Sequence, residues 1–131
     1  MNQATMQDMG RLILRLALGV LILLHGFAKL RGGLGGIEGM VQAHGLPGVF
    51  AYLVLVGEVV APLMVIIGLH ARIGAVLIAI NMLVAVFLVH MGDLGRLNNT
   101  GGWALELQAM FLFGAVAVAL LGPGRFSANQ R

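Results

Sequence analysis

Six polar or ionisable side chains interrupt otherwise apolar stretches of this sequence: His25, Lys29, Glu58, Asn81, His90 and Glu106. In the hydrocarbon core of a bilayer a charged side chain costs at least about 2.5–3.5 kcal/mol, so it needs a partner or a water-filled site. Imidazole and carboxyl groups can take up and release protons, and amino and amide groups can hydrogen-bond a ligand. The candidate catalytic residues are His25, Glu58 and Glu106. The candidate ligand-binding residues are Lys29, Asn81 and His90.

The composition around these residues is too apolar for a soluble domain of this size. Hydrophobic residues make up 60% of the 131 residues and charged residues 10%, against roughly 45–50% and 25% in ordinary globular proteins. The mean hydropathy is +0.98. The lysine and arginine residues occur singly rather than in runs, which does not favour nucleic-acid binding. The absence of cysteine excludes thiol exchange, thiolate metal sites and iron–sulfur clusters.

Four stretches are long and apolar enough to cross a bilayer, which takes about 20 residues of helix. The candidate spans are about 11–29, 49–69, 73–91 and 103–121. They predict an all-α membrane protein, a four-transmembrane-helix bundle that forms a single membrane domain over 1–131. The Gly-rich connector between the first two spans, about 34–45, carries apolar residues at helical spacing. It predicts a short amphipathic segment that lies at the membrane surface or folds back into the bundle.

Positive charge is divided unevenly between the two ends of the predicted bundle. Five arginines fall on the side of the N-terminus, and Lys29, Arg31 and Arg96 fall on the other side. The positive-inside rule then places both termini of this multi-pass chain in the cytoplasm. Because no small-residue cleavage site follows the first apolar stretch, we expect that stretch to remain as a span rather than to be removed as a signal peptide.

In this topology the polar residues gather at the midplane and in the outer half of the membrane. Glu58 falls at the middle of the second span, and His25 lies roughly 7–8 Å toward the outer side of the first. Glu106 lies about one helical turn inside the start of the fourth span. Asn81 falls at the middle of the third span, and His90, nine residues later, points to the opposite face, so Asn81 is the stronger candidate for the core. The asymmetry predicts a polar pocket that faces the periplasm.

Helical spacing indicates which of the polar side chains face the bundle. His25 and Lys29 are four residues apart and share one face of the first span. Arg15 lies close to the same direction, so we expect this face to point inward. Glu58 and Pro62 are also four residues apart, and a proline leaves the carbonyl of the fourth residue before it without its helical partner. A free carbonyl beside a buried carboxyl would make the middle of the second span polar.

Each candidate also has a purely structural interpretation, which the sequence leaves open. Lys29 could extend to the outer headgroups and Arg15 to the cytoplasmic ones. Glu106 could be a hydrated group at the rim. Asn81 could bridge two helices for about 0.6 kcal/mol. Glu58 could form only a structural pair with a basic residue of the first span.

Several short motifs stand in a characteristic order along the chain. They are HGFAKL at the end of the first span, HGLPG at the end of the connector, GEVVAPLMVIIG followed by HAR, GGWALELQAMF at the start of the fourth span, and GPGRFS at its exit. In this order they resemble the DoxX family of small bacterial four-helix membrane proteins, over about 11–127. The matching positions are His25, Gly26, Lys29, Leu30, Glu58, Gly68, Arg72, Glu106 and 122–127. The resemblance implies a bacterial inner-membrane location and an association with redox functions, since relatives include the membrane subunit of thiosulfate:quinone oxidoreductase.

The main hypothesis is a membrane redox component, an oxidoreductase subunit if it is catalytic, that binds a quinone or another lipophilic small molecule in the outer polar pocket. A quinone needs an apolar slot, a donor for its carbonyls and a group that handles protons. The alternatives are a non-catalytic scaffold for a soluble redox enzyme and a small dimeric transporter with Glu58 as the coupling group. We expect no metal site and no haem, because the facing of His25 and His90 is poor for axial ligation. The expected partners are the lipid bilayer, the lipophilic small molecule, a soluble redox protein and a second copy of the chain.

Overall fold

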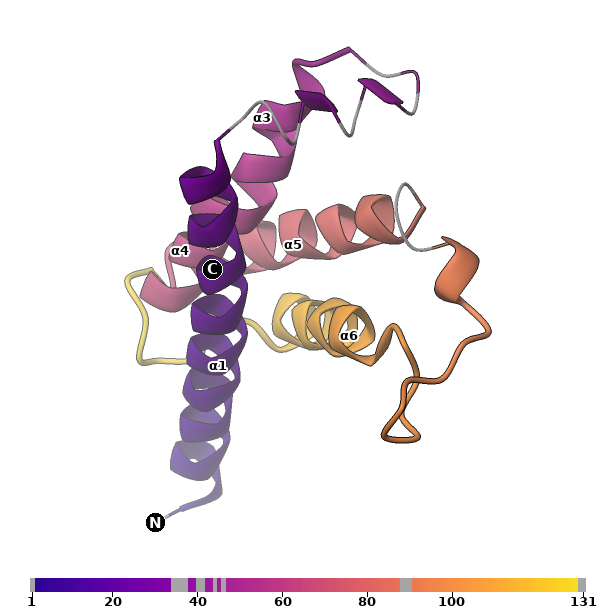
Figure 1. Ribbon diagram of the computed structural model, residues 1–131. Helices are drawn as coiled ribbons and strands as arrows, with labels where there is room; N and C mark the ends of the chain where they lie inside the picture. Colours follow the sequence, from indigo (N-terminus) through magenta and orange to yellow (C-terminus); the bar gives the residue numbers. More distant parts are fainter. Residues whose placement is uncertain are drawn as a thin grey trace.

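The computed structural model of the chain describes residues 2–33, 38–39, 42–43, 45, 47–87 and 91–129, with only the backbone of Lys29. Its helical elements are α1 (Gln3–Gly32), α3 (Phe50–Leu55), the π-helical segment η1 (Val56–Val60), α4 (Ala61–Ile67), α5 (Ala71–Ala85), the short 3-10 segment η3 (Met91–Asp93) and α6 (Glu106–Leu121). Figure 1 shows these elements in order. The all-helical prediction is confirmed for the described residues, in which no strand is found beyond one isolated bridge between Leu97 and Trp103.

Two helical stretches are long and apolar enough to cross a membrane: α1, and the continuous stretch Phe50–Ile67 made of α3, η1 and α4. The helices α5 and α6 are apolar but shorter, with 15 and 16 residues. Crossing by α5 and α6 therefore stays a prediction. Helix α1 begins at Gln3 rather than near residue 11, because Asn2 caps it by accepting a hydrogen bond from the backbone N–H of Thr5 at 2.8 Å.

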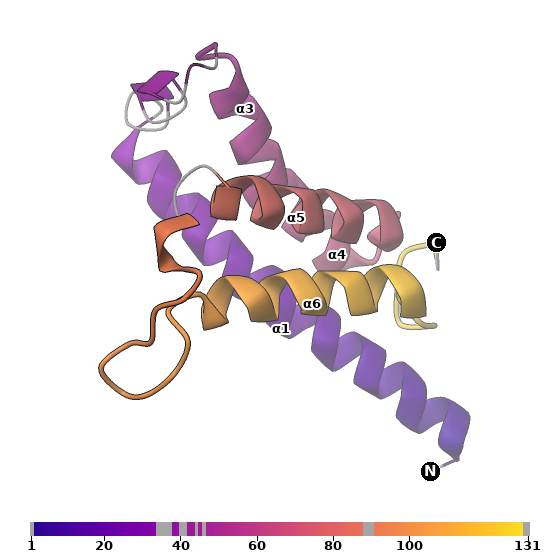
Figure 2. The ribbon, with the colours of Figure 1, turned by 90° about the vertical axis from the view of Figure 1, so that its right-hand side faces the viewer.

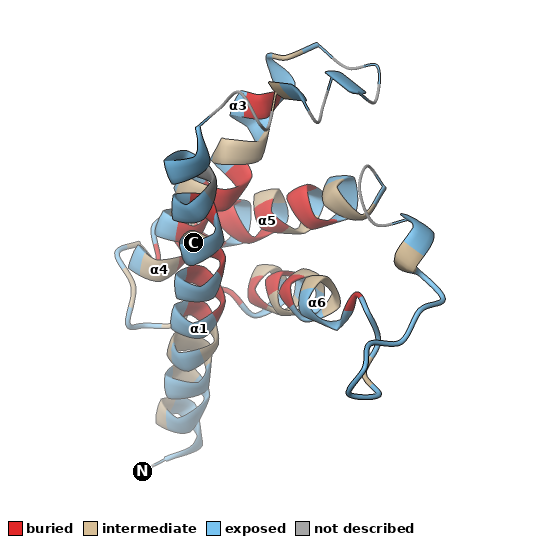
Figure 3. Cartoon of the chain, viewed as in Figure 1, coloured by how far each residue is buried: buried red, intermediate tan, exposed pale blue. Residues whose placement is uncertain are grey.

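The core lies where α1 and α4 meet the antiparallel pair α5 and α6. Alanines at the contacts are fully buried and let the helices approach closely: Ala61, Ala75 and Ala115. The outward faces carry large apolar side chains that are mostly exposed, among them Phe87, Met110 and Leu120. Figure 3 shows this division, with buried residues on the facing sides of the helices and exposed residues outside. An apolar outer surface of this extent is expected where lipid surrounds the protein.

Successive helical stretches run in alternating directions between the right and the left of Figure 2, so the molecule has two distinct ends. Both termini and the link between α4 and α5 lie at one end, which we call the terminal end. The connector after α1 and the loop before α6 lie at the other, which we call the loop end. In the connector, 38–39 and 42–43 are helical. The rest of the predicted amphipathic segment falls largely outside the described residues.

At the terminal end the segment after α6 folds back over the bundle. The backbone N–H groups of Ala128 and Asn129 donate to the carbonyls of Ile67 and Gly68, at 3.2 and 3.3 Å. Arg15 is 1% exposed and donates to the carbonyl oxygens of Val65, at 3.2 Å, and of Phe126. The side chain of Arg15 points inward, as expected for this face of α1. The prediction that it extends to the headgroups is wrong, because these two carbonyls hold the guanidinium inside the bundle.

Candidate functional site

The second helical stretch changes its winding at Glu58. Within η1 the backbone N–H of Ala61 bonds to the carbonyl of Val56, five residues earlier, instead of four. Pro62 follows directly and has no N–H to donate. For this reason the sequence predicted a free carbonyl at Glu58, and the π-turn around it is a finding of the structure. Such turns are frequent at functional sites because they re-aim side chains and loosen the backbone ladder.

Two glycines let neighbouring helices approach this irregular turn. A Cβ atom added to Gly26 of α1 would overlap the carbonyl oxygen of Glu58. A Cβ atom added to Gly57 would stand 2.6 Å from the Cβ atom of Asn81. Because both contacts are too close for any side chain, glycine is required at both positions for α1 and α5 to pack against η1.

The carboxyl group of Glu58 lies deep between the helices, with the residue only 3% exposed. The side-chain amide of Asn81, itself 9% exposed, donates a hydrogen bond to Glu58 Oε1 at 3.3 Å. A buried polar group is costly unless it is hydrogen-bonded, so Asn81 stabilises the position of the carboxyl. The predicted midplane pair is therefore brought together, with Asn81 acting through Glu58.

A cavity of about 190 Å³ opens beside this carboxyl. Its polar lining comes from His25, Glu58 and Gln108, and its apolar lining includes Ile22, Met82 and Phe111. His25 is exposed at the edge of the cavity, and its ring stands edge-on to Phe111, with centroids 5.7 Å apart and planes at 78°. The arrangement places a carboxyl on the inner wall and an imidazole at the rim.

Gln108 is the site residue that the sequence analysis missed. Its side-chain oxygen Oε1 is buried, and among the described residues it has no hydrogen-bond partner. Gln108 lies three residues before Phe111 and so shares its face of α6. The signal was available, because Gln108 and Glu106 are the two polar side chains of the fourth apolar stretch.

Glu106 lies outside the cavity. It is exposed at the first position of α6, and its carboxylate folds back over Gly102, where an added Cβ atom would come within 2.5 Å of Oε2. A carboxylate at a helix N-terminus is favoured by the helix dipole. The structure thus brings His25 and Glu58 to one cavity and leaves Glu106 at the surface of the loop end.

The two other predicted ligand-binding residues are not placed by the structure. The side chain of Lys29 and all of His90 lie outside the described residues. Their roles at the pocket stay predictions.

A second cavity, of about 130 Å³, lies between α5 and α6 toward the loop end. Its lining includes Leu94, Trp103 and Phe113, and it shares Met82 and Gln108 with the first cavity. The indole N–H of Trp103 donates to the carbonyl of Leu94 at 2.8 Å and closes the loop over this cavity. The polar cavity and the apolar cavity therefore adjoin, and Met82 and Gln108 line both of them.

Apolar helices with exposed apolar outer faces fit an α-helical membrane protein. The sequence model of the DoxX family matches residues 10–91, which is more than half of the chain, so the protein belongs to the DoxX family. This confirms the resemblance drawn from the motifs, over a shorter range than the motifs covered. The matched range contains His25, Glu58 and Asn81 and ends before Gln108.

Among curated proteins, the chain is similar to the protein named "Putative oxidoreductase CatD" of Bacillus subtilis (strain 168). The two are 32% identical over 87 residues, which are 64% of this chain and 62% of that protein. The match therefore spans less than two thirds of the relative's length. No solved structure matches the chain.

Proposed function

We propose that this DoxX-family protein is a four-span component of a membrane redox system that binds a quinone-like lipophilic molecule in the cavity beside Glu58. The observation that carries the proposal is the combination, in one apolar-walled cavity, of a buried carboxyl, a rim imidazole and a buried amide oxygen that has no hydrogen-bond partner among the described residues. Small-molecule sites commonly have mostly apolar walls and a few polar groups that orient the ligand. The name of the Bacillus subtilis relative supports the redox part.

The volume of the cavity limits which part of the ligand fits into it. An apolar cavity of roughly 150 Å³ accepts one benzene molecule, so about 190 Å³ accommodates one substituted ring. The rest of a lipophilic ligand must lie elsewhere. The adjoining apolar cavity beyond Met82 and Gln108, or the surrounding lipid, can take an apolar tail.

The chain's own residues would bind the ring and handle protons. A quinone takes up two electrons and two protons when it is reduced. His25 can donate an N–H to a ring oxygen at the rim. The side-chain N–H of Gln108 can donate to a quinone oxygen, and its Oε1 can accept from a hydroxyl of the reduced ring. Glu58, held by Asn81, can carry a proton on its carboxyl group between the cavity and the outer side. The electrons would come from a soluble redox partner.

Binding can be tested with a short-chain ubiquinone analogue titrated into the purified protein in detergent. Trp103 is the only tryptophan and lines the adjoining cavity, so quenching of its fluorescence reports the ligand. We expect Glu58→Gln and His25→Ala each to weaken binding about tenfold, the effect of losing about 1.4 kcal/mol. Glu106→Gln is the matched control, because it makes the same change outside the cavity, and it should bind as the wild type does.

Two results would overturn the proposal. Wild-type protein that is folded by circular dichroism and shows no saturable quenching does not bind the analogue. Equal affinities in the wild type, Glu58→Gln and His25→Ala would place the ligand elsewhere. In either case a scaffold for a redox enzyme, or a transporter in which Glu58 carries the coupled proton, becomes the better hypothesis.

We further propose that the protein resides in the bacterial inner membrane with both termini in the cytoplasm. The charge difference between the two ends supports this orientation. A fluorescent protein fused to the C-terminus should fluoresce, and an alkaline phosphatase fused there should be inactive. Active phosphatase at the C-terminus would reverse the orientation and would place the cavity on the cytoplasmic side.

A further inference from the structure

Arginines gather at the terminal end of the bundle, far from the cavity. Arg11, Arg15, Arg72 and Arg125 lie there, and among the described residues Asp8 is the one acidic side chain at this end. Among the described residues, four positive charges against one negative charge leave an excess of three positive charges at this end. The described residues do not neutralise this end.

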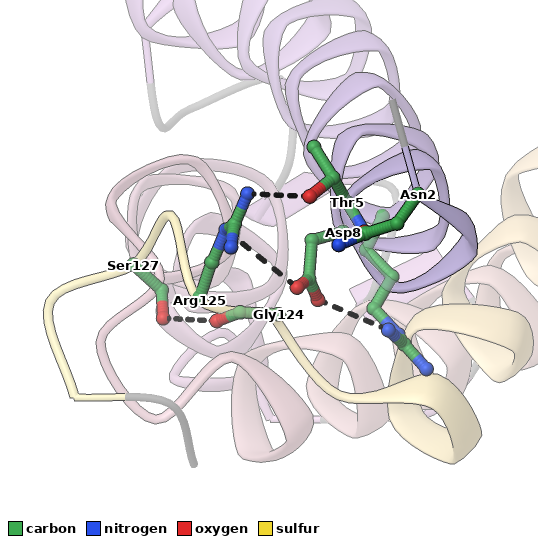
Figure 4. A network of polar contacts seen from close by, with 7 residues as sticks. Asn2, Thr5, Asp8, Gly124, Arg125 and Ser127 are labelled. Atoms are coloured by element: carbon green, nitrogen blue, oxygen red, sulfur yellow. Dashed lines mark hydrogen bonds and ion pairs between the residues drawn. The ribbon is translucent and has the colours of Figure 1, made fainter.

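Asp8 is shared between two of these arginines. Its Oδ1 atom lies 3.1 Å from Nη1 of Arg11, and its Oδ2 atom lies 3.8 Å from Nε of Arg125. Arg125 also donates to the hydroxyl of Thr5 at 3.0 Å. Figure 4 shows Arg125 reaching toward Thr5 and Asp8 from the segment that follows α6. The side chain of Arg125 is 50% exposed, so part of its guanidinium remains available to an outside anion.

Arg72 has no ion-pair or hydrogen-bond partner among the residues that the structure describes. It is exposed in the first turn of α5, and its guanidinium lies against the backbone of Gly122, where an added Cβ atom would be 2.7 Å from Nη2. Two residues later, a Cβ atom added to Gly124 would meet Asp8 Oδ1 at 3.1 Å and Arg11 Cδ at 3.3 Å. The short exit segment 122–124 therefore runs between Arg72 on one side and the Asp8–Arg11 pair on the other.

These arginines stand at the depth of lipid headgroups if α1 crosses the bilayer. Arg11 and Arg31 lie in the same helix, about 30 Å apart at 1.5 Å rise per residue, which is the thickness of the hydrocarbon core. We propose that Arg72 and Arg125, on the two sides of the exit segment, bind the headgroup phosphates of anionic phospholipids. A guanidinium is suited to this ligand because its planar N–H groups match two phosphate oxygens, and basic pockets between membrane helices commonly hold such headgroups.

The site is tested by native mass spectrometry of the purified protein in neutral detergent, with phosphatidylglycerol or phosphatidylcholine added. Wild-type protein should retain phosphatidylglycerol about tenfold more tightly than the zwitterionic lipid. Arg72→Gln and Arg125→Gln should each weaken phosphatidylglycerol binding about fivefold, as expected for one basic residue near a membrane surface. Arg72→Lys keeps the charge without the planar fork and should fall between the wild type and Arg72→Gln.

Arg96→Gln is the matched control, because Arg96 is an exposed arginine at the loop end, 2.9 Å from Asp93; it should retain the lipid fully. Equal retention of the two lipids by the wild type, or equal loss in Arg96→Gln, would overturn the proposal. Inorganic phosphate is added in a parallel arm. If it displaces phosphatidylglycerol at a similar concentration, the ligand is a free anion and the lipid assignment is wrong. Because these measurements do not involve the cavity, they stand apart from the test of quinone binding.

Discussion

The two ends of this protein differ in how tightly their helices are held together by hydrogen bonds. At the terminal end a buried arginine and several backbone hydrogen bonds tie the last residues to α1 and α4. Two cavities and an amide oxygen without a described partner lie toward the loop end, one cavity beside the π-turn and the other between α5 and α6. The charges differ in the same sense. The sequence places three basic and three acidic residues toward the loop end, whereas it places five arginines and one aspartate toward the terminal end.

This difference indicates how a small helical bundle can contain cavities and still be stable. Polar groups that are fully hydrogen-bonded order a structure, whereas incompletely satisfied ones raise its free energy unless a ligand pairs with them. The hydrogen bonds at the terminal end stabilise the bundle and offset the looser packing at the loop end. If this is correct, substitutions at the terminal end should change stability most, and substitutions at the loop end should change ligand binding most.

The largest effect is expected at Arg15. Arg15→Ala removes two hydrogen bonds from a charged donor and leaves a space in the bundle, so it should lower the free energy of unfolding by about 3–5 kcal/mol. Thermal unfolding in detergent, followed by circular dichroism, measures the loss. Arg11→Ala, one turn earlier on the same helix, breaks only a partly exposed ion pair and should cost less than about 1 kcal/mol. Similar losses of unfolding free energy in both variants would show that Arg15 does not hold the C-terminal segment on the bundle.

The next effect is expected where α1 crosses η1. Gly26→Ala places a Cβ atom against the carbonyl of Glu58, so the helices must separate, at a cost of about 1–3 kcal/mol. Ligand affinity should fall as well, because the crossing positions the Glu58 carboxyl. Gly10→Ala is the control in the same helix. No atom lies within 4 Å of its added Cβ, and it should be neutral or stabilising by up to about 1 kcal/mol. A harmless Gly26→Ala would contradict the close crossing.

At Gln108 we expect binding and stability to change in opposite directions. Gln108→Leu removes a buried acceptor without a described partner, so the protein should keep its melting temperature or gain slightly. The affinity for the ubiquinone analogue should drop about fivefold, the effect of losing one neutral hydrogen bond of about 1 kcal/mol from the side-chain N–H of Gln108 to a quinone oxygen. Gln7→Leu, at an exposed position of α1, should change neither. An unaltered affinity in Gln108→Leu would remove this residue from the site.

The smallest effect should distinguish the charges of the two ends. Asp8→Asn affects two arginines, whereas Asp93→Asn removes the carboxylate beside Arg96, a basic side chain that is 72% exposed. Asp8→Asn should cost up to about 1 kcal/mol at low salt and less at 0.5 M salt, because surface ion pairs are weak and are screened. The cost of Asp93→Asn should be smaller. The reverse order, measured as melting temperatures at the two salt concentrations, would argue against an excess of positive charge at the terminal end.

The sequence alone determined the helical class, the inward face of α1 and the carbonyl of Glu58 that lacks its helical partner at position 62. The first two follow from hydropathy and from the 3.6-residue period, which act within one segment. The third follows from Pro62, which removes a hydrogen bond wherever the helix is placed. The family could likewise be inferred from the order of short motifs, and the family match confirms it.

Only the tertiary structure decided which polar groups meet. Arg15 is held by the carbonyl of Phe126, more than a hundred residues later in the chain, and no local pattern encodes that return of the C-terminal segment. Glu106 and Gln108 are two residues apart in one apolar stretch, yet one lies at the surface and the other lines both cavities. Which of them faces inward depends on where α6 begins and how it rotates against α5. The packing of the whole bundle determines both, because depth along a span can be counted from the sequence, whereas rotation about the helix axis depends on the neighbouring helices.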